Sequence, residues 1–126
     1  MTSELRNIME INQLLSLWGH ILDAKEWDRL DHVLTPDATY DGSAFKFDRA
    51  TGIDAIRTVL SAANHALAHH STNVVVEEAE GDELRVISKG LGVMPGGVVG
   101  SVTYKDKLRL TDAGWRISER VLLLVA

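Results

Sequence analysis

Three histidines stand close together in the segment HALAHHSTNVVVEE, at positions 65, 69 and 70. Histidine has an unperturbed pKa of about 6.5, so it can take up and return protons near neutral pH. Side chains of adjacent strand residues point to opposite faces, so His69 and His70 cannot both enter one cavity if this segment is extended. We therefore expect at most one of them to do chemistry, the plain alternative being one packed and one exposed imidazole. His65 is expected on a helix surface.

Asp23 directly follows the last apolar residue of a helical stripe in the segment GHILDAKEW. A carboxylate at the C-terminal end of a helix meets the negative end of the helix dipole, which disfavours it there. Asp23 is therefore either a solvated residue near a helix end or a carboxylate that another group holds in place.

Several kinds of chemistry are excluded or disfavoured by what the chain lacks. It contains no cysteine, which removes thiolate nucleophiles, thiolate metal sites and disulfides. No G-x-S-x-G motif, glycine-rich phosphate loop or dinucleotide fingerprint occurs. A metal site is not expected, because the adjacent histidines diverge. If the protein is an enzyme, the sequence favours proton transfer without a cofactor.

The composition is that of one folded domain over residues 1–126, since 45% of the residues are hydrophobic and no linker or repeat occurs. The formal net charge is -5 and the 13 Lys and Arg residues form no basic stripe, so neither nucleic acid nor an anionic membrane is an expected partner. No apolar run approaches the ~20 residues of a membrane span, and the first residues lack the pattern of a signal peptide. We expect a cytoplasmic location.

Helical spacing of apolar residues dominates the first half of the chain. It predicts helices over residues 4–24, 26–34 and 52–65, with Pro36 placed to stop the second. Thr51 and Asp54 fit a capping box at the start of the third helix. A short strand and turn is expected over residues 37–45.

Near residue 70 the pattern changes to β-branched runs broken by turn signals. It predicts four strands, over residues 71–80, 83–94, 98–111 and 115–125, joined as an antiparallel meander. Helices followed by a sheet indicate an α+β fold, in which three N-terminal helices cover one face of a curved, mainly antiparallel sheet.

Glycine and leucine positions within these strands carry two further expectations. Gly90, Gly92 and Gly100 lie inside strand patterns, where glycine often marks a bulge or a sharp bend, and a strongly bent sheet encloses a pocket. An exposed sheet face could also pair with a second copy, so a homodimer or higher homo-oligomer is expected. The candidate residues for that face are Leu108, Leu110, Leu122 and Leu124.

Four segments carry a resemblance that covers nearly the whole chain: EINQLLSLWGHILDAKEWDRLDHVLTPDATYD, TGIDAIRTVL, HHSTNVVVE and DAGWRISER. In their order and spacing they resemble the SnoaL-like branch of the nuclear transport factor two-like superfamily. The resemblance implies a conical α+β barrel around a pocket. That scaffold serves dehydratases, dehydrochlorinases, isomerases, epoxide hydrolases, cyclases and non-catalytic modules, so the fold is implied more narrowly than the reaction.

The sub-group that the chain resembles includes scytalone dehydratase, hexachlorocyclohexane dehydrochlorinase and bile-acid dehydratase. These proteins pair a first-helix aspartate with a histidine at the start of a strand, and the matching positions here are Asp23 and His69. The resemblance implies that His69 is a general base which Asp23 orients. Such a pair is chemically reasonable, because a carboxylate bonded to one imidazole nitrogen fixes the tautomer and leaves the other nitrogen free to remove a proton from carbon.

Two substrate-binding residues are implied by the same resemblance. Five residues before the aspartate, relatives have a lysine or tyrosine that helps the leaving group depart, whereas this chain has Trp18, which offers an indole N–H but no acidic proton. In the dehydrochlorinase an arginine five residues after the last-strand tryptophan holds the leaving group, and the matching residue is Arg120. Strict alternation places Arg120 on the face opposite Trp115, so a β-bulge is needed for it to reach the pocket.

The residues and the resemblance together predict a cofactor-independent lyase of the dehydratase type, or an isomerase. His69 and Asp23 would abstract a proton from a small hydrophobic substrate, for example a cyclic one. Two alternatives on the same fold stay open. One is a module that binds a small apolar molecule without turning it over, and the other is a homo-oligomeric assembly module.

Overall fold

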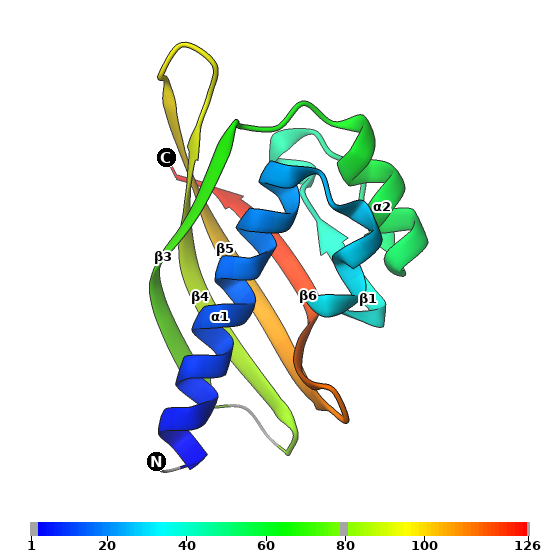
Figure 1. The fold of residues 1–126 in the computed structure, drawn as a ribbon, viewed down its shortest axis with the longest axis vertical. Helices are drawn as coiled ribbons and strands as arrows, with labels where there is room; N and C mark the ends of the chain where they lie inside the picture. Colours follow the sequence, from blue (N-terminus) through cyan, green and yellow to red (C-terminus); the bar gives the residue numbers. More distant parts are fainter. Residues whose placement is uncertain (1–2, 79–80, 126) are drawn as a thin grey trace.

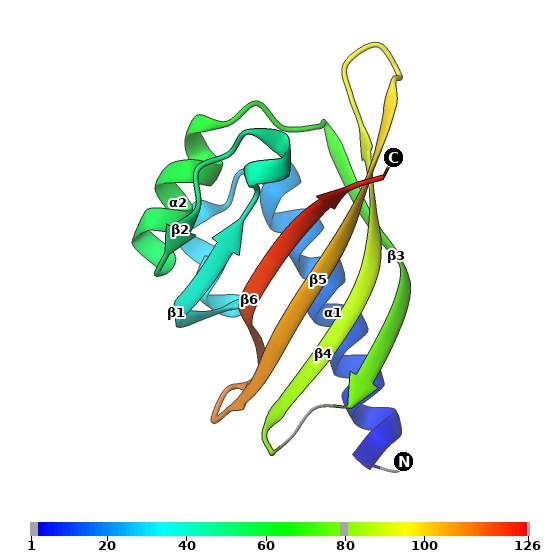
Figure 2. The same cartoon turned by 180° about the vertical axis from the view of Figure 1, so that it is seen from behind.

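Two layers follow from the two apolar periods of the sequence. The helices lie across one face of a curved sheet (Figure 1), and no helix of the described residues covers the opposite face (Figure 2). The computed structural model describes residues 3–78 and 81–125, so the predicted strand end at residues 79–80 lies outside the described residues. The elements in chain order are the α-helix α1 (Ser3–Ala24), the 3₁₀ helix η1 (Trp27–His32), β1 (Leu34–Asp41), the 3₁₀ helix η2 (Ser43–Phe45), β2 (Ala50–Thr51), α2 (Ile53–Ala62), β3 (Ala68–Glu78), β4 (Glu83–Val93), β5 (Val99–Thr111) and β6 (Gly114–Leu124).

The six strands are ordered β2-β1-β6-β5-β4-β3. Strands β3 to β6 form the predicted antiparallel meander, each paired with the next. Strand β1 pairs parallel with β6 and antiparallel with the short β2, and neither pairing was predicted. The edge strands β2 and β3 are not neighbours, so the sheet curves without closing. The predicted α+β class, with helices on a curved and mainly antiparallel sheet, is confirmed.

Strand β1 begins at Leu34, before its predicted start at residue 37, and it contains Pro36. Proline has no N–H to donate, and the pairing of β1 with β6 shifts between Leu34 and Thr39. Pro36 therefore interrupts a strand ladder, whereas the sequence analysis placed it just beyond a helix. The second predicted helix is a 3₁₀ helix that ends at His32.

The predicted capping box at the start of α2 is wrong. Thr51 lies in β2, opposite Thr39. The residue that caps α2 is Gly52, whose φ of 88° is open to glycine but strained for other residues. Asp54 instead accepts a hydrogen bond from Arg57 at 2.7 Å. Strand pairing of Thr51 therefore overrode a local helix-start signal.

A β-bulge in β3 decides which of its residues face the helices. The pairing with β4 shifts between Thr72 and Val75, around Asn73, whose φ is 53°. Asparagine tolerates this left-handed conformation better than most residues. After the bulge Val74 and Val76 pack against the core.

A second bulge lies in β6, where the pairing with β5 shifts and leaves Ser118 unpaired. Ile117 and Arg120 are consequently both buried. The sequence called for a bulge as the condition for Arg120 to reach the pocket; the bulge is present, but Arg120 does not line the cavity. Leu108 and Leu122 are buried as well, which makes the prediction of an exposed face wrong for these two residues. The outer face of the sheet instead carries Ile87, Val121 and Leu123.

Gly90, Gly92 and Gly100 are ordinary strand residues. The pairing of β4 with β5 runs without a shift from Glu83 opposite Arg109 to Val93 opposite Val99. Of the bulge or sharp bend expected at these glycines, the bulge is therefore wrong for this pairing, and all three glycines border the cavity.

Candidate active site

One stripe of α1 brings the helix against the start of β3. Leu15, Gly19 and Asp23 are spaced by four residues and share a helix face. The carbonyl oxygen of Leu15 accepts a hydrogen bond from the Ser71 hydroxyl at 3.1 Å. A Cβ on Gly19 would lie 2.8 Å from the carbonyl oxygen of His69, so the absence of a side chain allows this close approach. Helix and strand therefore lie side by side, and Asp23 comes to lie beside His69.

The end of α1 holds Asp23 in the last helical turn. Lys25 adopts the left-handed conformation with φ 54°. Its N–H bonds to the carbonyl oxygen of Leu22 at 3.1 Å, and the N–H of Glu26 bonds to that of Ile21 at 2.9 Å. This is the hydrogen-bond pattern of a Schellman motif, which terminates the helix at Ala24, one residue after Asp23.

Asp23 contacts both the backbone and the ring of His69. Nδ1 of His69 lies 2.6 Å from Oδ1 of Asp23, and the backbone N–H of His69 donates to Oδ1 and Oδ2 at 3.0 and 3.2 Å. Because a carboxylate accepts hydrogen bonds, Nδ1 carries the proton and Nε2 keeps a lone pair. The hydrogen bond expected from the sequence is present, and it leaves Nε2 free to accept a proton from a ligand.

The two adjacent histidines diverge as expected. His69 lines a cavity, whereas His70 is exposed and lies opposite Leu91 of β4. Only His69 of this pair can therefore meet a molecule in the cavity.

The cavity that His69 lines has a volume of about 170 Å³. Its buried walls include three aromatic side chains, since Trp18, Tyr40 and Tyr104 are 1%, 3% and 6% exposed, and Leu22 and Leu122 are buried beside them. The side chains of His69 and Asp23 are 16% and 27% exposed. The imidazole of His69 thus lies nearer the opening, with Asp23 behind it outside the cavity lining, and the tryptophan and tyrosines form the closed end.

Glycines of β4 and β5 create much of the cavity space. A Cβ on Gly90 would lie 2.5 Å from the Tyr104 ring, so glycine there lets that ring lie across the strand. Gly92 of β4 pairs with His69 of β3 on one side of its strand and with Gly100 of β5 on the other side. A Cβ on Gly100 would meet nothing within 4 Å. The sheet wall beside His69 therefore consists largely of backbone.

His65 belongs to the cavity wall and not to a helix surface, because α2 ends at Ala62. Its Nε2 lies 2.7 Å from the carbonyl oxygen of Leu60, so Nε2 is the protonated nitrogen of the neutral ring. The ring meets that of His69 edge to face, with centroids 5.8 Å apart. Burial lowers the pKa of His65, and the neighbouring His69 lowers it further. The H-x-x-x-H spacing of the two residues is the sequence signal for this contact.

Arg120 lies behind the cavity wall. Its guanidinium donates two hydrogen bonds to Asp106, each of 2.9 Å, and both side chains are fully buried. The guanidinium carbon also lies 3.8 Å from the ring centroid of Tyr104 and 4.7 Å from that of Trp18. Trp18 lines the cavity, but Arg120 does not, so a direct substrate contact by Arg120 has no support in this geometry. Sequence analysis did not single out Asp106, since one aspartate in a polar strand segment gives no sign of burial.

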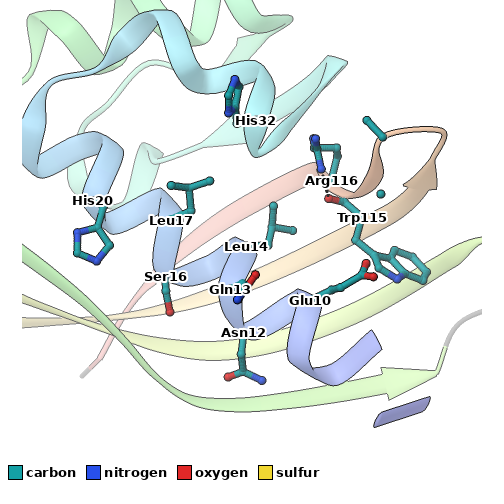
Figure 3. A pocket seen from close by; sticks show the side chains of 12 residues that line it. Glu10, Asn12, Gln13, Leu14, Ser16, Leu17, His20, His32, Trp115 and Arg116 are labelled. Carbon is teal, nitrogen blue, oxygen red and sulfur yellow. Dashed lines mark hydrogen bonds between the residues drawn. The ribbon is translucent and has the colours of Figure 1, made fainter. Parts of the chain in front are cut away.

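A larger and more open groove of about 720 Å³ lies along another side of α1, beside the β5–β6 turn (Figure 3). Its lining includes His20 of α1 and His32 of η1, which do not point toward one another, together with exposed polar residues such as Glu10 and Gln13. The lining of this groove does not include His69, whereas His69 lines the smaller cavity. We therefore assign the candidate site to the smaller cavity.

Within residues 3–78 and 81–125, no three His, Cys, Asp or Glu side chains gather into a group that could hold a metal ion. None of the described helices combines the length and the apolar composition needed to cross a membrane.

Residues 3–121 match the SnoaL-like domain family. The chain belongs to the SnoaL-like family. A search of curated proteins found no match to this chain. Solved structures, however, resemble it over nearly its whole length. A candidate aromatic ring hydroxylase from Novosphingobium aromaticivorans is 27% identical, with a TM-score of 0.78 over 97% of this chain and 91% of that chain.

Two further similar structures carry the names of enzymes that the sequence resembles. A candidate scytalone dehydratase from Novosphingobium aromaticivorans is 21% identical, with a TM-score of 0.77 over 98% of this chain and 85% of that chain. A hexachlorocyclohexane dehydrochlorinase from Novosphingobium barchaimii is 17% identical, with a TM-score of 0.79 over 98% of this chain and 89% of that chain. The predicted resemblance is confirmed, and the fold is the NTF2-like, or cystatin-like, fold. At these identities the two structures show the fold alone.

Proposed function

We propose that this SnoaL-like domain is a cofactor-independent lyase of the dehydratase type, or an isomerase, with His69 as general base and Asp23 as the residue that orients it. The observation that carries the proposal is the 2.6 Å contact between Nδ1 of His69 and Oδ1 of Asp23 at the wall of an aromatic cavity. Nε2 would remove a proton from a carbon atom next to a carbonyl or a leaving group, and the Asp23 carboxylate would stabilise the resulting imidazolium. General-base assistance of this kind contributes about 10²–10⁴-fold to a rate.

The cavity walls support a small, hydrophobic and cyclic substrate. Aromatic rings surround the space on several sides, including those of Trp18, Tyr40 and Phe47. Trp18 would contact the substrate directly. Arg120 would act through the rings of Trp18 and Tyr104, which lie between its guanidinium and the cavity.

Self-association remains part of the proposal. The outer face of the sheet is free of helices (Figure 2) and carries partly buried Ile87, Val121 and Leu123 beside the ion pair of Lys107 with Glu119. A face of mixed apolar and charged residues of both signs suits contact with a second copy of itself.

A panel of small cyclic hydroxy-ketones and halo-ketones tests the catalytic proposal, because elimination produces a conjugated product that absorbs in the ultraviolet. His69→Ala should lower turnover at least about 10²-fold. Asp23→Asn keeps the size of the side chain but removes its charge, and it should lower turnover strongly with the fold intact. His70→Ala is the matched control and should behave like the wild type, since His70 is exposed.

Two outcomes would reject this function. Turnover that survives in His69→Ala, or that falls equally in His70→Ala, would remove His69 as the base. Ligands of the panel that bind in the cavity but are never converted would favour the alternative of a non-catalytic binding module.

A further inference from the structure

The closed end of the cavity narrows the class of substrate, and this inference rests on the proposed function. We propose that the cavity takes a compact, uncharged, single-ring compound whose carbonyl oxygen accepts hydrogen bonds from the Tyr40 and Tyr104 hydroxyls. His69 then acts on the ring from the side nearer the opening.

The volume of the cavity sets the size limit. Its 170 Å³ is close to the roughly 150 Å³ of an apolar cavity that holds one benzene ring, and it is well below the roughly 300 Å³ at which pockets for drug-sized ligands begin. The backbone at Gly100 leaves open space in the cavity wall, since a Cβ there would meet nothing within 4 Å, whereas the Ala66 methyl group packs against Gly92. One six-membered ring with small substituents fits, whereas a fused polycyclic compound does not fit inside.

The two tyrosines supply hydrogen-bond donors. Both line the cavity, and burial raises the pKa of each hydroxyl. Tyr104 also raises the pKa of Tyr40. The two rings belong to one aromatic group, because Tyr40 stacks on Trp18 with centroids 5.9 Å apart and the Arg120 guanidinium lies against both Trp18 and Tyr104. Both groups therefore keep their protons over the ordinary pH range and can donate to an oxygen atom of a ligand.

Trp18 leaves the Tyr104 proton available for a ligand. The indole N–H of Trp18 is buried and has no hydrogen-bond partner within the usual geometric limits. It lies near enough to the Tyr104 hydroxyl to oppose, in part, the rise in pKa that burial causes there. The indole N–H can only donate, so it does not accept the hydroxyl proton of Tyr104, and that proton can be directed to a third group. A ligand oxygen would complete this series of donors and acceptors.

Charge excludes anionic ligands from the closed end. The cation beside the Trp18 and Tyr104 rings is Arg120, which is fully buried, does not line the cavity and is paired with Asp106. A carboxylate placed beside the tyrosines would therefore lose its water without gaining a free positive charge, and that is strongly unfavourable. A neutral carbonyl group needs only the donors that are present.

The donors also suit the proposed reaction. Removal of a proton from the carbon next to the carbonyl breaks a C–H bond, moves the proton to Nε2 of His69 and places negative charge on the carbonyl oxygen. Hydroxyls of Tyr40 and Tyr104 would stabilise that charge as it develops. The imidazolium then returns the proton to another carbon in an isomerisation, or the electron pair expels a neighbouring group in an elimination.

The experiment compares the affinities of cyclohexanone and methylenecyclohexane, which have nearly the same shape but differ in the acceptor oxygen. Binding is followed by NMR through the indole N–H signal of Trp18, assigned as the one of three tryptophan signals that Trp18→Phe removes. Cyclohexanone should bind about tenfold more tightly than methylenecyclohexane to the wild type. Tyr104→Phe should reduce this preference to less than about threefold, and Tyr40→Phe serves as a second variant should the first fail to fold.

Cyclohexanecarboxylate and 1-decalone test the limits on charge and size, and each should bind at least about tenfold more weakly than cyclohexanone. Equal binding of cyclohexanone and methylenecyclohexane, or tighter binding of the carboxylate or of the two-ring ketone, would overturn the inference. This outcome is separate from failure of the proposed function. Loss of turnover in His69→Ala without any preference for cyclohexanone rejects only the ligand class, whereas the preference without turnover rejects only the catalysis.

Discussion

Replacing Gly19 with alanine tests whether the close approach of α1 and β3 is what places Asp23 against His69. The new Cβ would lie 2.8 Å from the carbonyl oxygen of His69, so helix and strand must move apart. Extra atoms in a well-packed contact cost about 1–3 kcal/mol, whereas alanine in place of glycine inside a helix gains about 1 kcal/mol. We expect a net loss of up to about 2 kcal/mol in the free energy of unfolding.

Urea unfolding measures this loss, with Ser16→Ala as the matched control on the exposed side of α1. Ser16→Ala changes helix propensity alone and should be neutral or slightly stabilising. The NMR signal of the proton on Nδ1 of His69 reports the bond to Asp23, and it should shift or broaden in Gly19→Ala only. Gly19→Ala that is about 1 kcal/mol more stable than the wild type, with an unchanged His69 signal, would refute the reasoning.

Three further predictions concern the bulge, the second imidazole and the outer sheet face. Asn73→Gly should leave thermal stability nearly unchanged, whereas Asn73→Ala should lower it by about 1 kcal/mol because alanine is disfavoured at a φ of 53°; equal effects in thermal unfolding would contradict this role. Since burial lowers the folded pKa of His65, the wild type should lose stability as the pH falls below about 6.5, where the unfolded imidazole takes up a proton. His65→Gln should flatten that dependence in urea titrations between about pH 7.5 and pH 5.5, and parallel curves would count against it. Leu123→Lys should make the proposed dimer monomeric in light scattering while Leu110→Lys does not, and a wild type that is already monomeric at micromolar concentration removes the idea of a dimer.

Periodicity alone predicted the main elements, because the energy that determines them is local or repeats along the chain. The helix expected over residues 4–24 spans Ser3–Ala24, and the four strands of the meander end within a few residues of their predicted bounds. The polar turns between these strands separate the apolar runs clearly. Long-range pairing was harder: nothing in the residues of β1 indicates that it lies parallel to β6, since that choice depends on the whole sheet.

In the candidate site, too, some features could be predicted from the sequence and others depended on long-range contacts. The pairing of Asp23 with His69 was expected from a resemblance, and the alternation of strand side chains separated His69 from His70. The approach of helix and strand at Gly19 was not expected, because a glycine inside an amphipathic helix has several explanations until its neighbour is known. Asp106 alternates with the buried residues Tyr104 and Leu108 in β5, but a buried aspartate needs a partner, and that partner, Arg120, is turned inward by a bulge that the sequence did not show.

Asp106 decides whether the positive charge of Arg120 is available to a ligand. Removal of one partner from a buried ion pair leaves the other charge uncompensated, so Asp106→Ala should lower the free energy of unfolding by about 3–5 kcal/mol. Asp37→Ala is the control, because its pair with Arg109 is exposed and should contribute less than about 1 kcal/mol. Urea unfolding compares the two variants.

The double variant Asp106→Leu with Arg120→Met removes both charges and should recover most of the stability that Asp106→Ala loses, since apolar residues of similar volume can replace a buried ion pair. Recovery would show that Arg120 and Asp106 neutralise each other, and the cavity would then stay without a free cation. A loss in Asp106→Ala as small as that in Asp37→Ala would mean that the guanidinium finds another partner or water. In that case Asp106 would not neutralise Arg120, and anionic ligands would no longer be excluded from the closed end of the cavity.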